Sequence, residues 1–210
     1  MDVTIRNILS QEYNFNVDSL SVLEGGYNLD DTYLIVTNDH SKYVVKCIQY
    51  CLGVDHLRSI LYFQNLLHHS YDYPCSRIVL SNDQRLVLPV ENRFLFVQTF
   101  LEGLEPTRQT LDNDHSYLHE MGRLLGRWRI ASRHYTSSCL HMEQDREFTD
   151  KWWKEKQVVD DTDPVLLTNF MLCRQILVEL DKNLEHGLIH NDFHPNNTLT
   201  NSDGKIFVID

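Results

Sequence analysis

The C-terminal segment constrains the fold of this chain more than any other stretch, because polar residues at fixed spacing precede a hairpin pattern. It reads LIHNDFHPNNTLTNSDGKIFVID. The runs 198–200 and 205–209 are typical of strands, and the turn 201–204 between them ends in Asp-Gly, which suits positive φ. A hairpin of this kind brings its two ends together, so we expect Asn197 and Asp210 to lie side by side.

Oxygen-bearing side chains gather at the mouth of this hairpin. Asp192, Asn197 and Asp210 together form a candidate magnesium and phosphate site, because Mg²⁺ prefers one or two protein oxygens together with waters and phosphates. A polar surface loop that only joins a helix to a hairpin is the alternative, and it would be favoured for an isolated His-x-Asp. The full spacing His190-x-Asp192-x-x-x-x-Asn197, followed by an apolar strand ending in Asp210, favours the site.

The pattern resembles the catalytic and metal-binding loops of the aminoglycoside phosphotransferase and choline kinase-like family, small-molecule kinases related to the protein kinases. The family's His-x-Asp-x-x-x-x-Asn loop is matched at His190, Asp192 and Asn197, and its metal-binding aspartate is matched by Asp210. The variant HNDFHPNN is more similar to the small-molecule kinases than to the protein kinases.

The resemblance also implies a fold class. We expect an α+β, two-lobed protein kinase-like fold, with an N-lobe over residues 1–100 that combines an antiparallel sheet with a helix. A mainly helical C-lobe over residues 101–210 would carry the catalytic loop and the hairpin. This C-lobe is expected to be incomplete, because the family normally continues beyond the metal-binding aspartate.

Composition narrows the function classes. The chain has 210 residues, of which 42% are hydrophobic and 23% charged, as in ordinary soluble globular proteins. A net charge of −11 argues against nucleic acid as a partner. We expect no membrane span and no secretory signal, since no apolar run of about 18 residues occurs. Five scattered cysteines are interpreted as free thiols of a cytoplasmic protein.

Hydrophobic periodicity predicts the elements between the termini. Helices are expected over 3–12, 54–69, 114–133 and 165–184, with Asp112 or Asp114 as the cap of the third. Strands are expected over 20–23, 32–37 and 43–48, which form an antiparallel meander, and over 77–80, 85–90 and 94–100. The two runs 77–80 and 85–90 are interpreted as a hairpin around the turn 81–84.

Two features of the first strands suggest a phosphate-binding role. Gly25 and Gly26 lie at the turn between the first two strands, where backbone amides without a Cβ can approach a phosphate, although hairpins use glycine in any case. Lys46 lies inside an apolar strand and points either to a solvated face or inward. The resemblance implies that Lys46 positions the α- and β-phosphates of a nucleotide.

The chain departs from the family at the helix over 54–69. The family helix usually offers a glutamate to the strand lysine, but no acid occurs between Leu57 and His69, and Asp55 is the nearest. Either Asp55 serves, or the lysine is held otherwise, or the nucleotide site is degraded.

The apolar strand over 94–100 leads into Leu101-Glu102-Gly103. In the family such a strand passes into a linker whose backbone hydrogen-bonds adenine, which places the hinge at Thr99, Phe100 and Leu101. A plain core strand that ends at a glycine turn fits the local sequence equally well.

The resemblance implies an ATP- and Mg²⁺-dependent transfer of the γ-phosphoryl group to a hydroxyl of a small molecule: an amino sugar, an amino alcohol or a hydroxy amino acid. Asp192 would act as the base, His190 would brace the loop, Asn197 and Asp210 would hold Mg²⁺, and Lys46 would position the phosphates. The alternative is a truncated or non-catalytic kinase-like protein that binds nucleotide or a partner without turnover. The sequence indicates neither the acceptor nor the oligomeric state.

Overall fold

A computed structural model describes the chain in several segments. The described residues are 2–23, 31–50, 52–133, 135, 188, 190 and 192–209. Three predicted site residues, Gly25, Gly26 and Asp210, lie outside the described residues, as does the predicted helix over 165–184.

The chain divides into two compact units. One consists of Met1–Ala131 together with Ile189–Asp210, and the other of Ser132–Leu188. The first unit contains residues from both sides of the lobe boundary predicted at residue 100. That boundary stays a prediction.

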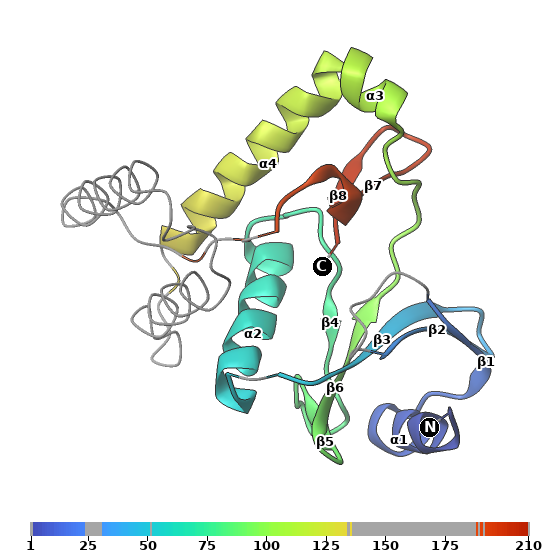
Figure 1. Ribbon diagram of the computed structural model, residues 1–210. Coiled ribbons are helices and arrows are strands. Elements are labelled where there is room, and N and C mark those ends of the chain that lie inside the picture. Colours follow the sequence, from blue (N-terminus) through green and yellow to red (C-terminus); the bar gives the residue numbers. More distant parts are fainter. Residues whose placement is uncertain are drawn as a thin grey trace, which may run out of the picture. The chain divides into compact units, whose positions relative to one another are not determined.

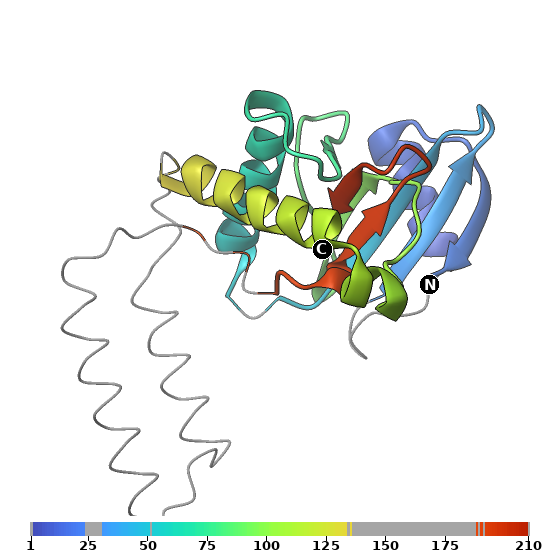
Figure 2. The same ribbon diagram turned by 90° about the horizontal axis from the view of Figure 1, so that it is seen from above.

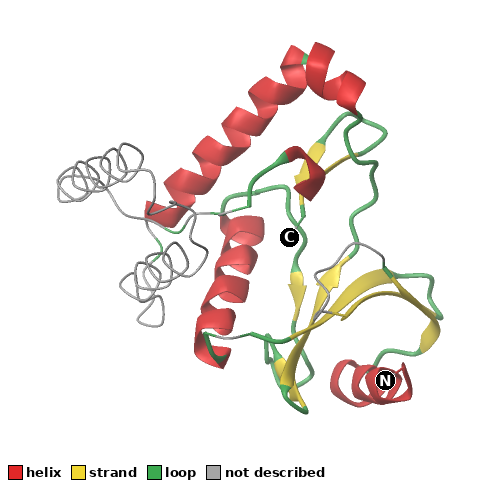
Figure 3. Cartoon of the chain, viewed as in Figure 1, coloured by secondary structure: helices red, strands yellow, loops and turns green. Residues whose placement is uncertain are grey.

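The described elements are helices and strands, with the strands in three groups along the chain (Figures 1 and 3). In chain order they are α1 (Asp2–Tyr13), β1 (Val17–Val22), β2 (Asp31–Thr37), β3 (Lys42–Ile48), α2 (Val54–Ser70), β4 (Ile78–Val79), β5 (Leu88–Val90), β6 (Arg93–Thr99), α3 (Arg108–Asn113), α4 (His115–Arg133), a 3₁₀ turn η1 (Pro195–Asn197), β7 (Thr198–Thr200) and β8 (Ile206–Val208). None of the described helices has both the length and the apolar character needed to cross a membrane.

The N-terminal sheet is antiparallel. Among the described residues its strands follow the order β1-β2-β3-β6-β4, and β5 also pairs with β6. The predicted meander and the antiparallel N-lobe are therefore confirmed, and the fold class is α+β.

The predicted hairpin between residues 77–80 and 85–90 is wrong. β4 and β5 both pair with β6 and not with each other. The loop between them closes on itself, because the Ser81 amide donates to the Arg85 carbonyl (2.9 Å) and the Arg85 amide donates to Ser81 Oγ (3.1 Å). The hairpin of this region joins β5 to β6 through a turn in which Glu91 has a positive φ of 55°.

The two faces of the sheet bury different helices, because successive side chains of a strand point to opposite faces. On one face α1 packs with the sheet, and the cluster includes Ile5, Leu9, Ile35, Val45 and Val97. On the other face α2 packs with the sheet, and the cluster includes Leu57, Leu61, Ile78, Val87 and Phe96. Burying each such side chain stabilises the fold by about 1.5–3 kcal/mol relative to leaving it exposed.

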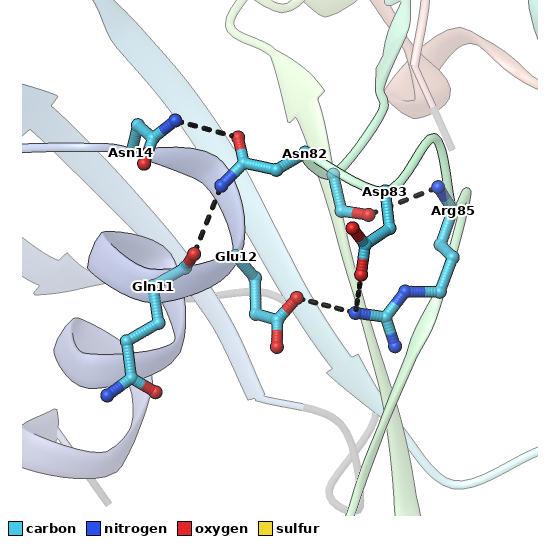
Figure 4. Close-up of polar contacts among 7 residues, drawn as sticks. Gln11, Glu12, Asn14, Asn82, Asp83 and Arg85 are labelled. Atoms are coloured by element: carbon cyan, nitrogen blue, oxygen red, sulfur yellow. Dashed lines mark hydrogen bonds and ion pairs between the residues drawn. The ribbon is translucent and has the colours of Figure 1, made fainter.

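Polar contacts attach the end of α1 to the loop between β4 and β5 (Figure 4). Asn82 donates to the Gln11 carbonyl oxygen (3.0 Å) and accepts from the Asn14 side chain (3.0 Å). Arg85 forms an ion pair with Glu12 (2.5 Å). Exposed ion pairs contribute little, so the apolar cluster holds α1 on the sheet and these contacts fix its end.

The predicted helix over 114–133 is confirmed as α4, with Asp114 as its cap. Asp114 Oδ1 accepts from the amides of Ser116 (3.0 Å) and Tyr117 (3.1 Å). The Ser116 hydroxyl and these amides hold the pKa of Asp114 below its usual value. Asp112 lies instead in α3, a helix absent from the sequence prediction, which begins after the capping residue Thr107.

The C-terminal hairpin is confirmed as β7 and β8, with Gly204 at a φ of 79° in the turn. It is hydrogen-bonded to two other segments. The Val208 amide donates to the Pro74 carbonyl oxygen (2.8 Å), and Leu104 and Thr200 exchange two backbone bonds (3.0 and 2.9 Å). The hairpin is thereby tied both to the chain after α2 and to the chain after β6, and it lies beside α4 (Figure 2).

Candidate functional site

A cavity of about 250 Å³ brings together segments that are far apart in the sequence. Its lining comprises Leu23, Thr32, Val44, Lys46, Ser76, Gln98, Thr99, Phe100, Leu101, Glu105, Asn196, Asn197, Leu199 and Ile209. Five predicted site residues therefore share one cavity. A larger hollow of about 610 Å³ beside α3, α4 and the hairpin contains none of the predicted residues.

The strand register explains why Lys46 reaches this cavity. Val44 pairs with Gln98, and Lys46 pairs with Phe96, so these four side chains lie on one face of the sheet. Phe96 packs in the α2 cluster, which identifies this as the α2 face. Lys46 therefore points inward, half-buried, and not to a solvated face.

Asp55 does not accompany Lys46 in the cavity. Its carboxylate accepts from Arg58 (2.8 Å) on the surface of α2 and is 69% exposed. Glu105 is the one acid in the described lining of the cavity, and it comes from the segment after β6. Of the three explanations for the missing helix acid, the one that uses Asp55 is not supported.

In the segment after β6, the Leu101 amide lies beside the cavity without a backbone partner among the described residues. The Thr99 amide donates to the Arg77 carbonyl oxygen (2.9 Å) and the Phe100 amide to the Lys42 carbonyl oxygen (3.3 Å), which completes the sheet. The Leu101 amide makes no such bond within the described residues. A planar ligand with an acceptor at its edge could bind there.

Gly103 fixes where this segment goes next. A Cβ at Gly103 would lie 2.8 Å from Leu199 Cβ and 3.0 Å from the Thr200 carbonyl oxygen. Only glycine permits this close approach. The segment after β6 is therefore held directly against β7, next to the loop that carries Asn197.

A short network orders the loop before β7. Asn197 Nδ2 donates to Asp192 Oδ2 (2.8 Å) and to the Asp192 carbonyl oxygen (3.0 Å). His194 Nε2 lies 3.3 Å from Asp192 Oδ1. The carboxylate remains 69% exposed, so it is oriented but accessible. The sequence analysis gave His194 no role, although its place two residues after Asp192 could have indicated one.

Asn197 lies where the hairpin prediction places it. The Ile209 amide donates to the Asn197 carbonyl oxygen (2.9 Å), so the hairpin ends do meet, although Asp210 itself lies outside the described residues. Because Asn197 Nδ2 donates to Asp192, the side-chain oxygen Oδ1 is the part of the amide that could bind a cation.

His190 packs among aromatic rings. Its ring centroid lies 4.9 Å from that of Trp128 and 5.5 Å from that of Phe193. Nδ1 is buried and has no hydrogen-bond partner among the described residues. Burial lowers the pKa of His190, which favours the neutral ring. These surroundings suit a residue that braces the loop.

The donor set fits a cation that is shared with phosphates. Within the described part of the chain, no three His, Cys, Asp or Glu residues form a group that could hold a metal by themselves. Mg²⁺ needs no such group when phosphates and waters complete its shell. Asn197 Oδ1 and the neighbouring Asp192 carboxylate are described oxygens that could contribute to such a shell.

Comparisons with known proteins agree with this geometry. The model of the phosphotransferase enzyme family matches residues 19–210. A search of the curated proteins gives no match. Similar solved structures include spectinomycin phosphotransferase, APH(9)-Ia, in complex with ADP and spectinomycin (15% identity, 99% of this chain and 68% of that chain, TM-score 0.61).

Two solved kinase structures are also similar in fold to this chain. Amicoumacin kinase hAmiN in complex with AMP-PNP, Ca²⁺ and Ami shares 17% identity over 100% of this chain and 63% of that chain, with a TM-score of 0.69. The microcompartment-associated aminopropanol kinase shares 20% identity over 100% of this chain and 69% of that chain, with a TM-score of 0.70. These likenesses show the fold, and this chain spans about two thirds of the length of each structure.

Proposed function

Since the chain belongs to the phosphotransferase enzyme family, we propose that it is a small-molecule kinase that transfers the γ-phosphoryl group of ATP to a hydroxyl group. The observation that carries the proposal is the cavity in which Lys46, the segment Thr99 to Leu101 and Asn197 meet. Each of these comes from a different element, and each suits a different part of one nucleotide.

In the proposed complex the base lies against the segment after β6 and the phosphates lie between Lys46 and Asn197. The Leu101 amide would donate to the base. Lys46 would hold the α- and β-phosphates through its positive charge, and Gly25 and Gly26 would offer backbone amides to them. ADP and AMP-PNP in the complexes of two similar structures support a nucleotide in this chain.

Asp192 is the proposed base. Asn197 and His194 hold its carboxylate. The carboxylate would accept a hydrogen bond from the acceptor hydroxyl and take its proton as the hydroxyl oxygen bonds to the γ-phosphorus. The bond between that phosphorus and the β–γ bridging oxygen breaks, and ADP leaves. His190 would brace the loop.

Asn197 Oδ1 and Asp210 are the proposed ligands of Mg²⁺. When bound, the ion supplies charge neutralisation on the phosphates. Positioning and charge neutralisation account for most of the catalysis of phosphoryl transfer, so a chain with these residues needs no covalent intermediate.

The proposed acceptor is an amino sugar, an amino alcohol or a hydroxy amino acid. Spectinomycin phosphotransferase and aminopropanol kinase are named for acceptors of such kinds. We place the reaction in the cytoplasm, where the free, buried thiols of Cys47 and Cys75 stay reduced.

A second candidate function is nucleotide binding without turnover. The observation that favours it is the absence of an α2 acid beside Lys46 in the described lining of the cavity. The two candidates predict the same ligand and differ only in whether a phosphorylated product forms.

Phosphoryl transfer tests the proposal. The purified chain is incubated with ATP, Mg²⁺ and a panel of the three acceptor classes, and phosphorylated product is detected by mass spectrometry. Asp192→Asn should lower kcat by about 10²–10⁴-fold, whereas Asp203→Asn in the exposed hairpin turn should retain the activity. ATP binding without product from any acceptor would favour the second candidate, and absence of ATP binding would refute both.

A further inference from the structure

A chain of buried hydrogen bonds runs from α2 through the segment before β4 to β6 and ends at the wall of the cavity. Gln64 Nε2 donates to the Ser76 carbonyl oxygen (3.0 Å) and to Ser76 Oγ (2.8 Å). Ser76 Oγ in turn donates to Gln98 Oε1 (3.1 Å). Ser76 is 2% exposed and Gln98 is 7% exposed, and both line the cavity.

The Ser76 carbonyl fixes the direction of the bonds that start at Gln64. A carbonyl oxygen only accepts, so the Gln64 atom that contacts the Ser76 carbonyl must be the amide nitrogen. The same nitrogen donates to the Ser76 hydroxyl, whose one hydrogen is then available to Gln98. Gln98 Oε1 accepts from this hydroxyl (3.1 Å) and also from Gln64 Nε2 (3.5 Å). An NH₂ group of Gln98 in that place would face the NH₂ group of Gln64, so Oε1 lies on this side and Nε2 lies on the other side.

Gln98 lines the cavity, and its side-chain donor Nε2 has no hydrogen-bond partner among the described residues. Nε2 is also not among their fully buried unpaired atoms, so it is available to a ligand in the cavity. Gln98 directly precedes the segment at 99–101 and shares the cavity face of the sheet with Val44 and Lys46. A locked hydrogen-bond donor therefore stands beside the place where the proposed function puts the base.

We infer that Gln98 determines nucleobase specificity by presenting this donor, so that 6-oxopurine nucleotides such as GTP and ITP serve as phosphoryl donors beside ATP. The inference rests on the proposed function, because it concerns the base of the same nucleotide. A free glutamine amide can read adenine through both its groups, accepting from N6 and donating to N7. Here Oε1 is held by Ser76 and by Gln64, so only the donor is presented.

The two purine classes differ at the edge that a donor reads. A 6-oxopurine offers two acceptors, N7 and O6, whereas adenine offers the acceptor N7 and a donating amino group at position 6. If the Gln98 amide cannot rotate, its Nε2 donor gains an acceptor at O6 of a 6-oxopurine. In adenine the same Nε2 meets a second donor, the amino group N6. Gln98 should therefore favour an oxo group over an amino group at this position.

A purely structural role for Gln98 makes a different prediction. If the Gln64–Ser76–Gln98 chain served only to satisfy buried polar groups, replacing Gln98 would weaken all nucleotides equally. The informative quantity is therefore the ratio of the Kd values for ADP and IDP, which differ in the position-6 group and the N1 hydrogen. Comparing this ratio between two proteins cancels effects at the segment after β6.

The test measures ADP and IDP affinities by isothermal titration calorimetry with Mg²⁺ for the wild type, Gln98→Met and the control Gln109→Met. Gln109 is exposed on α3, outside the cavity lining. We expect Gln98→Met to shift the ratio toward ADP by about three- to tenfold, the size expected for one neutral hydrogen bond. The control should keep the wild-type ratio.

An unchanged ratio in folded Gln98→Met would overturn the inference, while nucleotide binding itself would leave the proposed function standing. If the wild type binds neither nucleotide, the proposed function and the inference both fall. Ser76→Ala serves as a second variant should Gln98→Met not fold. It removes the shorter of the two bonds to Gln98 Oε1 and leaves only the 3.5 Å contact from Gln64 Nε2. The amide can then turn and accept from N6, and the ratio should again move toward ADP. If Ser76→Ala keeps the wild-type ratio of the Kd values for ADP and IDP, the inference that Gln98 presents a locked donor is wrong.

Discussion

The hydrogen bonds that link Tyr117, Thr198 and Pro195 allow a quantitative test of what holds the loop that carries Asn197. Tyr117 Oη lies 2.6 Å from Thr198 Oγ1, which donates to the Pro195 carbonyl oxygen (2.6 Å). The single hydrogen of the threonine hydroxyl goes to Pro195, so Tyr117 must be the donor to Thr198. Both side chains are buried, Tyr117 at 4% and Thr198 at 1% exposure. The perturbations are Tyr117→Phe, Thr198→Val and the double variant.

The three variants should lose different amounts of the free energy of unfolding. Tyr117→Phe removes one donor and leaves the bond from Thr198 to Pro195, so we expect a loss of about 0.5–1.5 kcal/mol. Thr198→Val keeps the shape but leaves the buried Tyr117 hydroxyl unsatisfied, which costs about 1–3 kcal/mol. It also removes one of two bonds to the Pro195 carbonyl, which still accepts from the backbone amide of residue 198, and this adds about 0.5–1.5 kcal/mol. We therefore expect Thr198→Val to cost about 2–4 kcal/mol. In the double variant the tyrosine hydroxyl is absent, so its penalty disappears.

Urea unfolding followed by circular dichroism measures these differences, with m-values checked for constancy. The double variant should be more stable than the sum of the single losses by about 1 kcal/mol or more. Additive losses, or a Thr198→Val cost no larger than that of Tyr117→Phe, would refute the bond directions assigned here.

Three further predictions concern the surroundings of the site. Gly103→Ala should destabilise the fold by about 1–3 kcal/mol in urea unfolding because its Cβ meets the β7 backbone, whereas Gly126→Ala in α4, where nothing lies within 4 Å, should stabilise by about 0.5–1 kcal/mol. The pKa of His190 is lowered in the folded state, so the stability linked to it is present above pH about 6.5 and is lost as pH falls, and His190→Gln should flatten this part of the pH profile. Burial raises the pKa of the Cys75 thiol to about 12 and also raises that of Cys47. Both thiols should resist Ellman's reagent at pH 8 until the chain unfolds, and rapid labelling of the folded chain at either would contradict this.

Local patterns predicted most of the described elements. The hairpin of β7 and β8 follows from its turn residues, and α2 follows from helical periodicity. The partner of a short strand is a different matter, because nothing in residues 77–90 indicates that β4 and β5 both pair with β6. α3 was missed because its short run shows no apolar periodicity and buries no residue.

The candidate site was partly predictable for a similar reason. Asn197 could be found because it belongs to a recognisable local motif, and Lys46 because the resemblance to the family singles out a lysine inside an apolar strand. The bond between Tyr117 and Thr198 joins residues 81 positions apart, and the bond between Ser76 and Gln98 joins residues 22 positions apart. A glutamine in an apolar strand carries no sign of its partner, so the Gln64–Ser76–Gln98 chain emerges only when α2, the segment before β4, and β6 pack together.

The most direct test of the central claim, that the cavity binds the phosphates of a nucleotide, is a thermal shift of the chain with ATP and Mg²⁺. At 100 times Kd, ATP should stabilise the chain by about 2.7 kcal/mol, which corresponds to a rise in Tm of about 5–10 °C for a chain of this size. Lys46→Met should lose most of this rise. Lys42→Met should keep it, since Lys42 pairs with Glu102 outside the cavity lining. No rise in the folded wild type, or an equal rise in both lysine variants, would contradict the account.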